Sequence, residues 1–206
     1  MSKDDQMAAG PDRVIEIYRR YASEWASDRG SSLVEKDWLD RFLAQLAERP
    51  AVLDIGCGSG DPIARYLIGA GCRMTGVDSS QGLLALCKDK FPAHRWLEGD
   101  MRTLCLGQKF DGILAWDSFF FLRPEDQRKM FGIFRDHSAP GGSLMFTSGT
   151  SHGVVIGEYR GEPLYHASLD PGEYRLLLRT NGFEVTAHAV EDPGCGGRTV
   201  WLARRG

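Results

Sequence analysis

The sequence predicts an open α/β sheet in which strands and helices alternate along most of the chain. Short apolar segments bounded by glycine alternate with segments whose apolar residues recur every three or four positions, a pattern typical of parallel strands and their connecting helices. The last two apolar segments are joined only by a short turn, which indicates an antiparallel pair. The length of 206 residues is enough for one hydrophobic core of this kind.

Two amphipathic helices are expected before the first strand. One runs from Val14 to Trp25 and the other from Val34 to Leu46. The first carries Tyr18, Tyr21 and Trp25 at helical spacing. Such an aromatic stripe is usually ordinary packing, and covering a ligand site is the alternative.

Seven strands are expected in the rest of the chain, at residues 51–55, 74–77, 95–98, 111–116, 143–147, 183–190 and 199–203. Helix starts are expected at Asp61-Pro62, Ser80, Arg123-Pro124 and Asp170-Pro171. Residues 149–169 show no clear period, and a loop of that length is usually functional. Val154–Ile156 and Tyr159 are also compatible with short paired strands.

The composition argues against several classes of protein. Hydrophobic residues make up 42% and charged residues 26%, with a net charge of -3, so no basic excess favours nucleic acid. The longest apolar run, Leu83–Cys87, is far shorter than the roughly 18 residues of a membrane helix. The start of the chain has no apolar signal core, so a cytoplasmic protein without membrane partners is expected. The five cysteines are scattered, and no disulfide framework or metal site is expected.

Glycine is the unusual component, with 25 residues or about 12% against a usual value near 7%. Gly56, Gly58 and Gly60 follow an apolar strand and precede a helix, an arrangement in which backbone amides approach a ligand closely. A dinucleotide fingerprint places its third glycine one residue later, and Asp61 is a poor neighbour for a pyrophosphate. An oxidoreductase with a nucleotide cofactor is therefore the less favoured alternative.

Two acids follow the next two expected strands. Asp78 lies 22 residues after Gly56, about where a carboxylate binds ribose hydroxyls, although it also fits a helix cap. Asp100 follows the third strand, where Gly-Asp is also a common turn. The carboxyl ends of three successive strands thus carry ligand-binding groups at one edge of the sheet.

From about residue 18 to residue 205, these motifs resemble the class I S-adenosylmethionine-dependent methyltransferases. The resemblance implies a Rossmann-like, doubly wound sheet of seven strands, mixed because the last strand is antiparallel, with helices on both faces and extra N-terminal helices. It implies S-adenosyl-L-methionine as cofactor and S-adenosyl-L-homocysteine as product. The residues implied to bind the cofactor are Tyr21, Trp25, Arg29, Asp54, Gly56, Cys57, Gly58, Gly60, Asp78, Ser79, Asp100, Met101 and Trp116.

The resemblance further implies one methyltransferase domain over residues 1–206, a monomer or homodimer acting on a small-molecule acceptor by in-line transfer. Its parts are N-terminal helices at about 11–48, a cofactor-binding core at 51–148, a substrate-side insertion at 149–169 and a C-terminal helix and hairpin at 170–206. A base is needed only if the acceptor must lose a proton. His166 is the first candidate for that base, and His152 and Asp117 are the alternatives. Candidate acceptor-binding residues are Asp117, His152, Tyr159, Tyr165 and His166.

Two further alternatives remain open at the level of sequence. One is a non-catalytic protein that binds S-adenosylmethionine as a sensor or partner subunit. The other is a different reaction on the same cofactor, because a fold and a cofactor site do not fix the chemistry.

Overall fold

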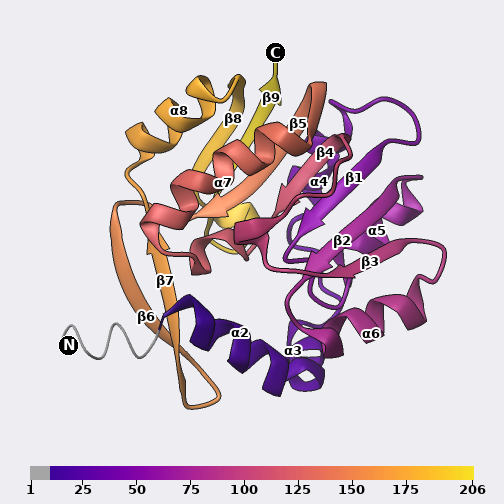
Figure 1. Ribbon diagram of the computed structural model, residues 1–206, viewed down its shortest axis with the longest axis vertical. Helices are drawn as coiled ribbons and strands as arrows, with labels where there is room; N and C mark the ends of the chain where they lie inside the picture. Colours follow the sequence, from indigo (N-terminus) through magenta and orange to yellow (C-terminus); the bar gives the residue numbers. More distant parts are fainter. Residues whose placement is uncertain (1–9) are drawn as a thin grey trace.

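A seven-stranded mixed sheet runs through the centre of the computed structural model, which describes residues 10–206 (Figure 1). The strand order is β3-β2-β1-β4-β5-β9-β8. β1 to β5 are mutually parallel where they pair, and β9 is antiparallel to both of its neighbours. The predicted fold class is confirmed. The strands are β1 (Ala51–Ile55), β2 (Arg73–Asp78), β3 (Arg95–Glu98), β4 (Phe110–Ala115), β5 (Ser138–Ser148), β8 (Phe183–Asp192) and β9 (Arg198–Arg205).

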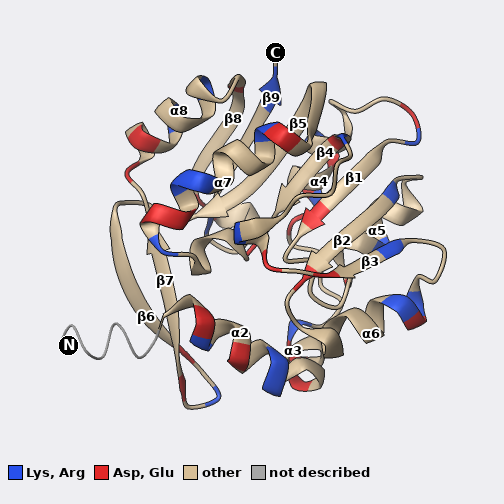
Figure 2. Ribbon diagram, in the orientation of Figure 1, with Lys and Arg blue, Asp and Glu red and all other residues tan. Residues whose placement is uncertain are grey.

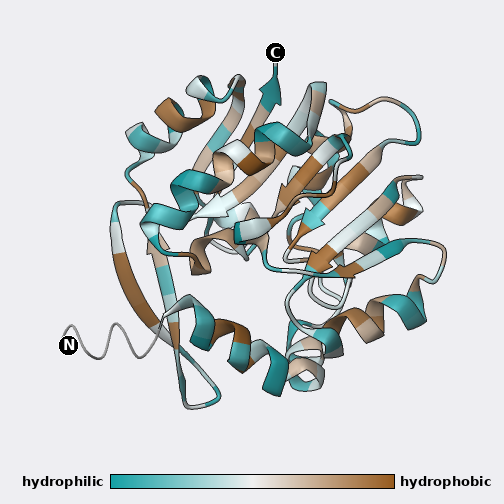
Figure 3. Ribbon diagram, viewed as in Figure 1, coloured by the Kyte–Doolittle hydropathy of each residue, from teal (hydrophilic) through white to brown (hydrophobic). Residues whose placement is uncertain are grey.

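Helices cover both faces of the sheet, because alternate residues of each strand point to opposite sides. In β1, Leu53 packs on one face with α7 and α8, whereas Val52 packs on the other with α4, α5 and α6. Figure 3 shows the resulting hydrophobic centre of β1 and β4 and the more hydrophilic outer helices. The covering helices are α4 (Lys36–Leu43), α5 (Ile63–Gly69), α6 (Gln81–Lys90), α7 (Pro124–His137) and α8 (Pro171–Thr180).

The first predicted helix is two helices, α2 (Pro11–Arg20) and α3 (Ala22–Arg29). The break falls at Tyr21, where φ is -108° and the helical bonding pattern stops. The bend lets α2 pack against the strand β7 (Glu162–Ser168), while α3 packs against α6. Figure 1 shows both helices below the sheet, across the ends of β2 and β3.

The segment at 149–169 is a β-hairpin rather than a loop. β6 (Gly153–Tyr159) pairs antiparallel with β7, with Gly153 opposite Ser168. These strands form a separate two-stranded sheet beside α2. The amide of Gly149 donates to Ser168 Oγ over 2.6 Å, so the two ends of the hairpin are joined where it leaves β5.

The predicted helix start at Asp61-Pro62 is wrong. The helix α5 begins at Ile63, and no side chain caps it. The Asp61 carboxylate pairs with Arg65 and Lys90, each over 2.6 Å, so it is held by cations and not by helix amides. β5 also begins five residues earlier than predicted, at Ser138.

Three short 3-10 helices complete the chain, η1 (Met101–Thr103), η2 (Phe119–Phe121) and η3 (Pro193–Cys195). Each follows the end of a strand at the edge of the sheet where β1 and β2 also end. Within residues 10–206, no helix is both long enough and apolar enough to cross a membrane.

Candidate functional site

The turn after β1 holds three glycines in a backbone conformation that other residues rarely adopt. Gly56, Gly58 and Gly60 have φ values of 83°, 55° and 77°. The turn is fixed to β2, because the amide of Gly56 donates to the carbonyl oxygen of Val77 over 2.7 Å. A Cβ atom on Gly56 would lie 2.3 Å from the Cβ of Ser118. No larger residue fits there, because Ser118 occupies that space, and Gly56 and Gly58 line a cavity beside it.

Asp78 ends β2 beside this turn. Its carboxylate oxygens accept hydrogen bonds from the amides of Gly58 and Ser80, each over 2.9 Å. Burial raises the pKa of Asp78, and the amides of Ser80, Gly58 and Ser79 act in the opposite direction. Each carboxylate oxygen retains a lone pair, so the group can still accept bonds from ligand hydroxyls.

Asp54, in β1, is a second acid of unusual proton affinity. Its side chain is buried, and burial together with the charge of Asp78 raises its pKa to about 7. A cation bound nearby would favour the ionised form of this group.

Asp100 follows β3 and is already engaged by a neighbour. Burial raises its pKa, but the side-chain and backbone bonds from Arg102 outweigh that effect and leave the pKa lowered. Arg102 Nη2 lies 2.6 Å from Asp100 and 2.8 Å from Asp12 of α2. Asp100 is thus an ionised acceptor at the rim of the site.

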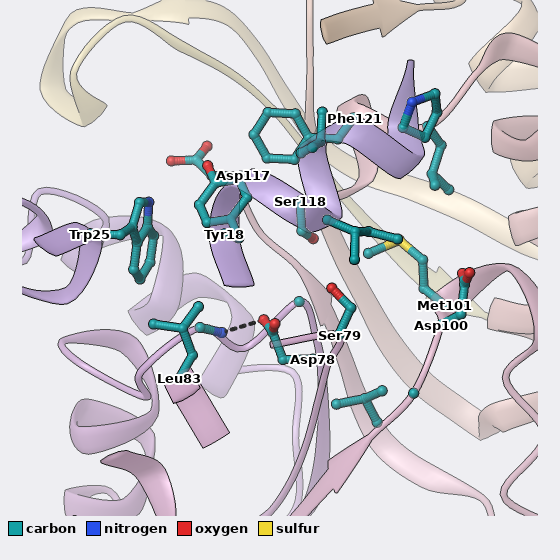
Figure 4. A pocket seen from close by; sticks show the side chains of 18 residues that line it. Tyr18, Trp25, Asp78, Ser79, Leu83, Asp100, Met101, Asp117, Ser118 and Phe121 are labelled. Atoms are coloured by element: carbon teal, nitrogen blue, oxygen red, sulfur yellow. Dashed lines mark hydrogen bonds between the residues drawn. The ribbon is translucent and has the colours of Figure 1, made fainter. Parts of the chain in front are cut away.

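A cavity of about 100 Å³ lies between these strand ends and the N-terminal helices. Figure 4 shows Asp78 and Ser79 on one side of it and the rings of Tyr18 and Trp25 on the other. A Cβ on Gly58 would lie 2.8 Å from the Trp25 ring, so this ring covers the glycine turn closely.

A second cavity of about 690 Å³ lies beside the first. The two share five lining residues, Tyr18, Trp25, Gly56, Asp117 and Phe121. Typical small-ligand pockets measure roughly 300–1,000 Å³. A ligand of that size seated on the glycine turn would therefore reach from the smaller cavity into the larger one.

Asp117 stands where the two cavities meet. Its φ is 45°, an unusual backbone conformation for a residue other than glycine. Arg198, at the start of β9, pairs with its carboxylate through Nε over 2.8 Å and Nη2 over 2.7 Å. The amide of Asp117 also donates to Thr147 Oγ1 over 2.9 Å. Ends of β4, β5 and β9 thereby fix one carboxylate at the junction.

His166 of β7 lines the larger cavity from the opposite side. Its Nδ1 lies 3.0 Å from the carbonyl oxygen of Leu164. A carbonyl only accepts, so Nδ1 carries the hydrogen and Nε2 keeps a free lone pair. Burial lowers the pKa of His166 from 6.5, against the opposing effects of that bond and of Asp117. The ring is therefore neutral near pH 7 and able to accept a proton.

Most of the predicted residues come together at these two cavities. Trp25, Gly56, Gly58, Asp78, Ser79, Asp100, Met101 and Asp117 line the smaller one. Trp25, Arg29, Asp54, Gly56, Cys57, Gly60, Trp116, Asp117 and His166 line the larger one. Within residues 10–206, Trp116 Nε1 is a buried donor without a partner, which leaves it available to a ligand.

Four predicted residues lie elsewhere. His152 lines a third cavity of about 480 Å³ between β5 and the hairpin. The rings of Tyr21 and Tyr159 contact each other at a centroid distance of 6.1 Å, and Tyr159 Oη donates to Asp28. Tyr165 is buried in an apolar cluster, because alternation along β7 turns it away from His166. None of these four lines either of the two cavities.

Arg29 lines the larger cavity and is also bonded within the chain. Its guanidinium pairs with the fully buried carboxylate of Glu35, and Nη1 donates to the carbonyl of Ser32 over 3.0 Å. Its binding of a ligand carboxylate stays a prediction.

Sequence reasoning missed Phe121 and Arg198 as lining residues and left Tyr18 open between packing and covering a ligand. Ser118 after the end of β4, which the family resemblance implied to lie near the sulfonium, lines the smaller cavity, and its Oγ donates to the carbonyl of Ile55 over 2.7 Å. Arg198 comes directly after two glycines, and no spacing rule relates it to Asp117, which lies 81 positions earlier.

The donor and acceptor set suits a ligand with hydroxyl groups and a cationic centre. Asp78 and Asp100 supply acceptors, the glycine turn leaves the backbone accessible, and the aromatic faces of Tyr18 and Trp25 favour a cation.

Residues 10–206 hold no group of three or more His, Cys, Asp or Glu side chains placed to bind a metal ion.

Comparison with known proteins gives a family match over the core of the site. Residues 52–142 match the family model described as methyltransferase domain. This segment runs from β1 into β5 and includes the glycine turn, Asp78, Asp100 and Asp117.

Two curated relatives and one solved structure are similar over longer stretches. The malonyl-[acyl-carrier protein] O-methyltransferase of Pseudescherichia vulneris is 32% identical over 56% of this chain and 46% of its own length. The dTDP-4-amino-2,3,4,6-tetradeoxy-D-glucose N,N-dimethyltransferase of Saccharopolyspora spinosa is 24% identical over 82% of this chain and 71% of its own. CalS10, an S-adenosylmethionine-bound amino pentose methyltransferase from Micromonospora echinaspora, has a TM-score of 0.70 at 21% identity, covering 90% of this chain and 96% of that one. The chain spans about half the length of several curated relatives that it matches.

Proposed function

Because residues 52–142 place this chain in the class I S-adenosylmethionine-dependent methyltransferase family, we propose that it transfers the methyl group of S-adenosylmethionine to a small-molecule acceptor. The observation that carries the proposal is the junction of the two cavities. The glycine turn and Asp78 lie on one side of it and His166 on the other. The relatives named as methyltransferases act on a carrier-bound malonyl group and on an amino sugar, which favours catalysis over binding alone.

The cofactor would be held by the residues at the strand ends. Asp78 would accept from the ribose hydroxyls, and Asp100 and Met101 would lie against the adenine. The aromatic faces of Tyr18 and Trp25 suit the positive charge of the sulfonium. When bound, this cofactor supplies an electrophilic methyl group on a cationic leaving group.

The acceptor would occupy the larger cavity. In-line displacement needs the nucleophile held opposite the leaving sulfur, and most of the rate enhancement comes from that alignment. Asp117 and Arg198 form a fixed pair at the junction and would orient the acceptor. Walls of Trp116, Phe120 and Phe121 would limit the entry of water.

His166 would accept the proton when the nucleophile must lose one. Its free Nε2 and lowered pKa keep it neutral and basic near pH 7. Asp117 is less suited to this role, because its carboxylate is already paired with Arg198.

We further propose that the chain is one domain with the parts set out above, in which the hairpin of 149–169 is the acceptor-side insertion.

Titration calorimetry with S-adenosylmethionine, S-adenosylhomocysteine and NAD tests the cofactor. Binding of both sulfur compounds and not of NAD is expected, and absence of sulfur-compound binding would contradict the proposal. A panel of small amines, alcohols and carboxylic acids, followed by mass spectrometry for a gain of one methyl group, then tests turnover. Binding without any methylated product would favour a sensor.

A further inference from the structure

The N-terminal helices and the hairpin share an apolar cluster of their own. Val14 and Ile17 of α2 pack with Leu164, Tyr165 and Ala167 of β7, and all five are buried. This cluster is distinct from the two that cover the faces of the central sheet. The helix and the strand, more than 140 positions apart, thus form one packed unit.

Glu162 at the start of β7 ties this unit together electrostatically. Its carboxylate lies 2.5 Å from Arg13 Nη2 and 2.6 Å from Arg20 Nη1, which stand at the two ends of α2. Only 17% of the Glu162 side chain is exposed, so the pairs are partly protected from solvent. Figure 2 shows charged residues of both signs on α2 and at the tip of the hairpin.

The same helix is also attached to the cofactor side. Arg19 Nε donates to the carbonyl of Ser79 over 2.9 Å, and Tyr18 lines the smaller cavity together with Trp25 of the next helix, α3. The hairpin in turn carries His166 into the larger cavity. The packed unit of α2 and β7 therefore carries Tyr18, which lines the smaller cavity, and His166, the candidate base in the larger cavity.

We propose that Glu162 is a positioning residue for methyl transfer, which links the helix covering the cofactor to the strand bearing His166. With α2 packed beside the smaller cavity, Glu162 holds β7 against this helix and thereby sets the position of His166 in the larger cavity. Glu162 itself touches neither cavity and acts only through Arg13 and Arg20. The inference rests on the proposed function, because it needs the cofactor beneath α2.

The test compares Glu162→Gln with Glu158→Gln, which removes the same charge from an exposed position on the same hairpin. Stopped-flow Trp fluorescence measures release of S-adenosylhomocysteine. Loss of two partly exposed ion pairs should speed release by about 3- to 10-fold in Glu162→Gln and by less than about 2-fold in the control. Release equally fast in both variants would overturn the inference.

A second readout follows His166 directly. The chain has five histidines, so the ring signals of His166 can be assigned by NMR with His166→Gln. Addition of S-adenosylhomocysteine should shift these signals in the wild type and in Glu158→Gln, and by less than half as much in Glu162→Gln. A purely structural Glu162 would leave the shift intact, and that result would overturn the proposal.

A double-mutant cycle with Arg20→Gln identifies the partner. Because Glu162→Gln already removes the pair with Arg20, the double variant should release the product no faster than Glu162→Gln alone, and additive effects would contradict the link. If the wild type fails to bind S-adenosylhomocysteine, the proposed function fails first. If the wild type binds S-adenosylhomocysteine and Glu162→Gln shows the same release rate and the same His166 shift, only the positioning role is contradicted.

Discussion

The cavity beside Gly56 and the cavity beside His166 are neighbours, yet their walls come from different kinds of segment. The first joins Gly56, Asp78 and Asp100 at the ends of β1, β2 and β3 to apolar side chains of α2, α3 and the segment after β4. The second joins the turn before β9, the end of β4 and the hairpin, held in place by side-chain pairs such as Asp117 with Arg198.

Because of this difference, substitutions should have different effects at the two cavities. The strand ends that line the first cavity have little freedom to change, because their positions are set by the hydrogen bonds of the sheet. A cavity formed by side chains from distant segments can change shape with single substitutions. Changes on the first side should therefore act on cofactor affinity, and changes on the second on turnover and acceptor affinity.

Replacement of His166 by Gln should have the largest effect. Loss of a general base typically lowers turnover by about 10²- to 10⁴-fold, whereas S-adenosylhomocysteine affinity should stay within about 3-fold because the ring lies outside the smaller cavity. Steady-state kinetics and calorimetry measure the two. His94→Gln, between α6 and β3 and outside all three cavities, is the matched control and should keep turnover near that of the wild type. Full turnover in His166→Gln would remove it as the base.

The pH profile gives a second test of the same residue. Burial lowers the pKa of His166 below 6.5, and the ring must be neutral to accept a proton. kcat/KM should therefore be retained at neutral pH and lost as the pH falls through a value below 6.5. In His166→Gln this acid limb should vanish, and a limb that persists would belong to another group.

Gly56→Ala should abolish measurable cofactor binding. The new Cβ would meet Ser118 at 2.3 Å, and the φ of 83° is unfavourable for alanine. We expect a loss of affinity of about 100-fold or more by calorimetry, with circular dichroism to check folding. Gly69→Ala, where nothing lies within 4 Å of the added Cβ, should bind as the wild type does. Equal binding by both variants would mean that the turn does not contact the cofactor.

Asp78→Asn should weaken cofactor affinity by about 10- to 100-fold, through loss of charge-assisted bonds to two hydroxyls. Isothermal calorimetry with S-adenosylhomocysteine measures the change. Asp89→Asn makes the same substitution at an exposed position on α6 and should have no effect. Unchanged affinity in Asp78→Asn would exclude it from the ribose site.

The smallest effect is expected from Arg198→Gln, on the acceptor side. Asp117 would lose its partner at the cavity junction, and the acceptor KM should rise by about 5-fold for a partly exposed pair. Cofactor affinity should change less than 2-fold by calorimetry. Arg179→Gln, on the exposed side of α8, is the control. A loss of cofactor affinity larger than the rise in acceptor KM would contradict the assignment of Arg198 to acceptor binding alone.

Sequence patterns predicted the glycine turn and the place of Asp78 beside it because their geometry is local. Strand, glycine turn and helix follow one another within a few residues of Gly56, and Asp78 ends the adjacent strand. Regular backbone hydrogen bonding turns such spacing into a defined position. The seven strands and their order of appearance follow from the same local periodicity.

The acceptor side escaped prediction because its contacts are not local. Arg198 meets Asp117 only after β9 has inserted between β5 and β8. The hairpin lacks a clear strand period, because Val155 is exposed while Leu164 and Tyr165 are both buried against α2. The pair of Arg29 with Glu35, which lies beyond the end of α3, could not be predicted for the same reason.

The bond between Gly149 and Ser168 has a consequence for how this protein can diversify. It closes the base of the hairpin, so that residues 150–167 form a cassette whose two ends meet at a fixed point of the scaffold. Such a cassette can be lengthened, shortened or exchanged without shifting β5 or α8. The face of the hairpin that packs on α2 is less free to change, because any replacement must still cover Val14 and Ile17. Acceptor choice and the N-terminal helix would then evolve together while the sheet stays unchanged.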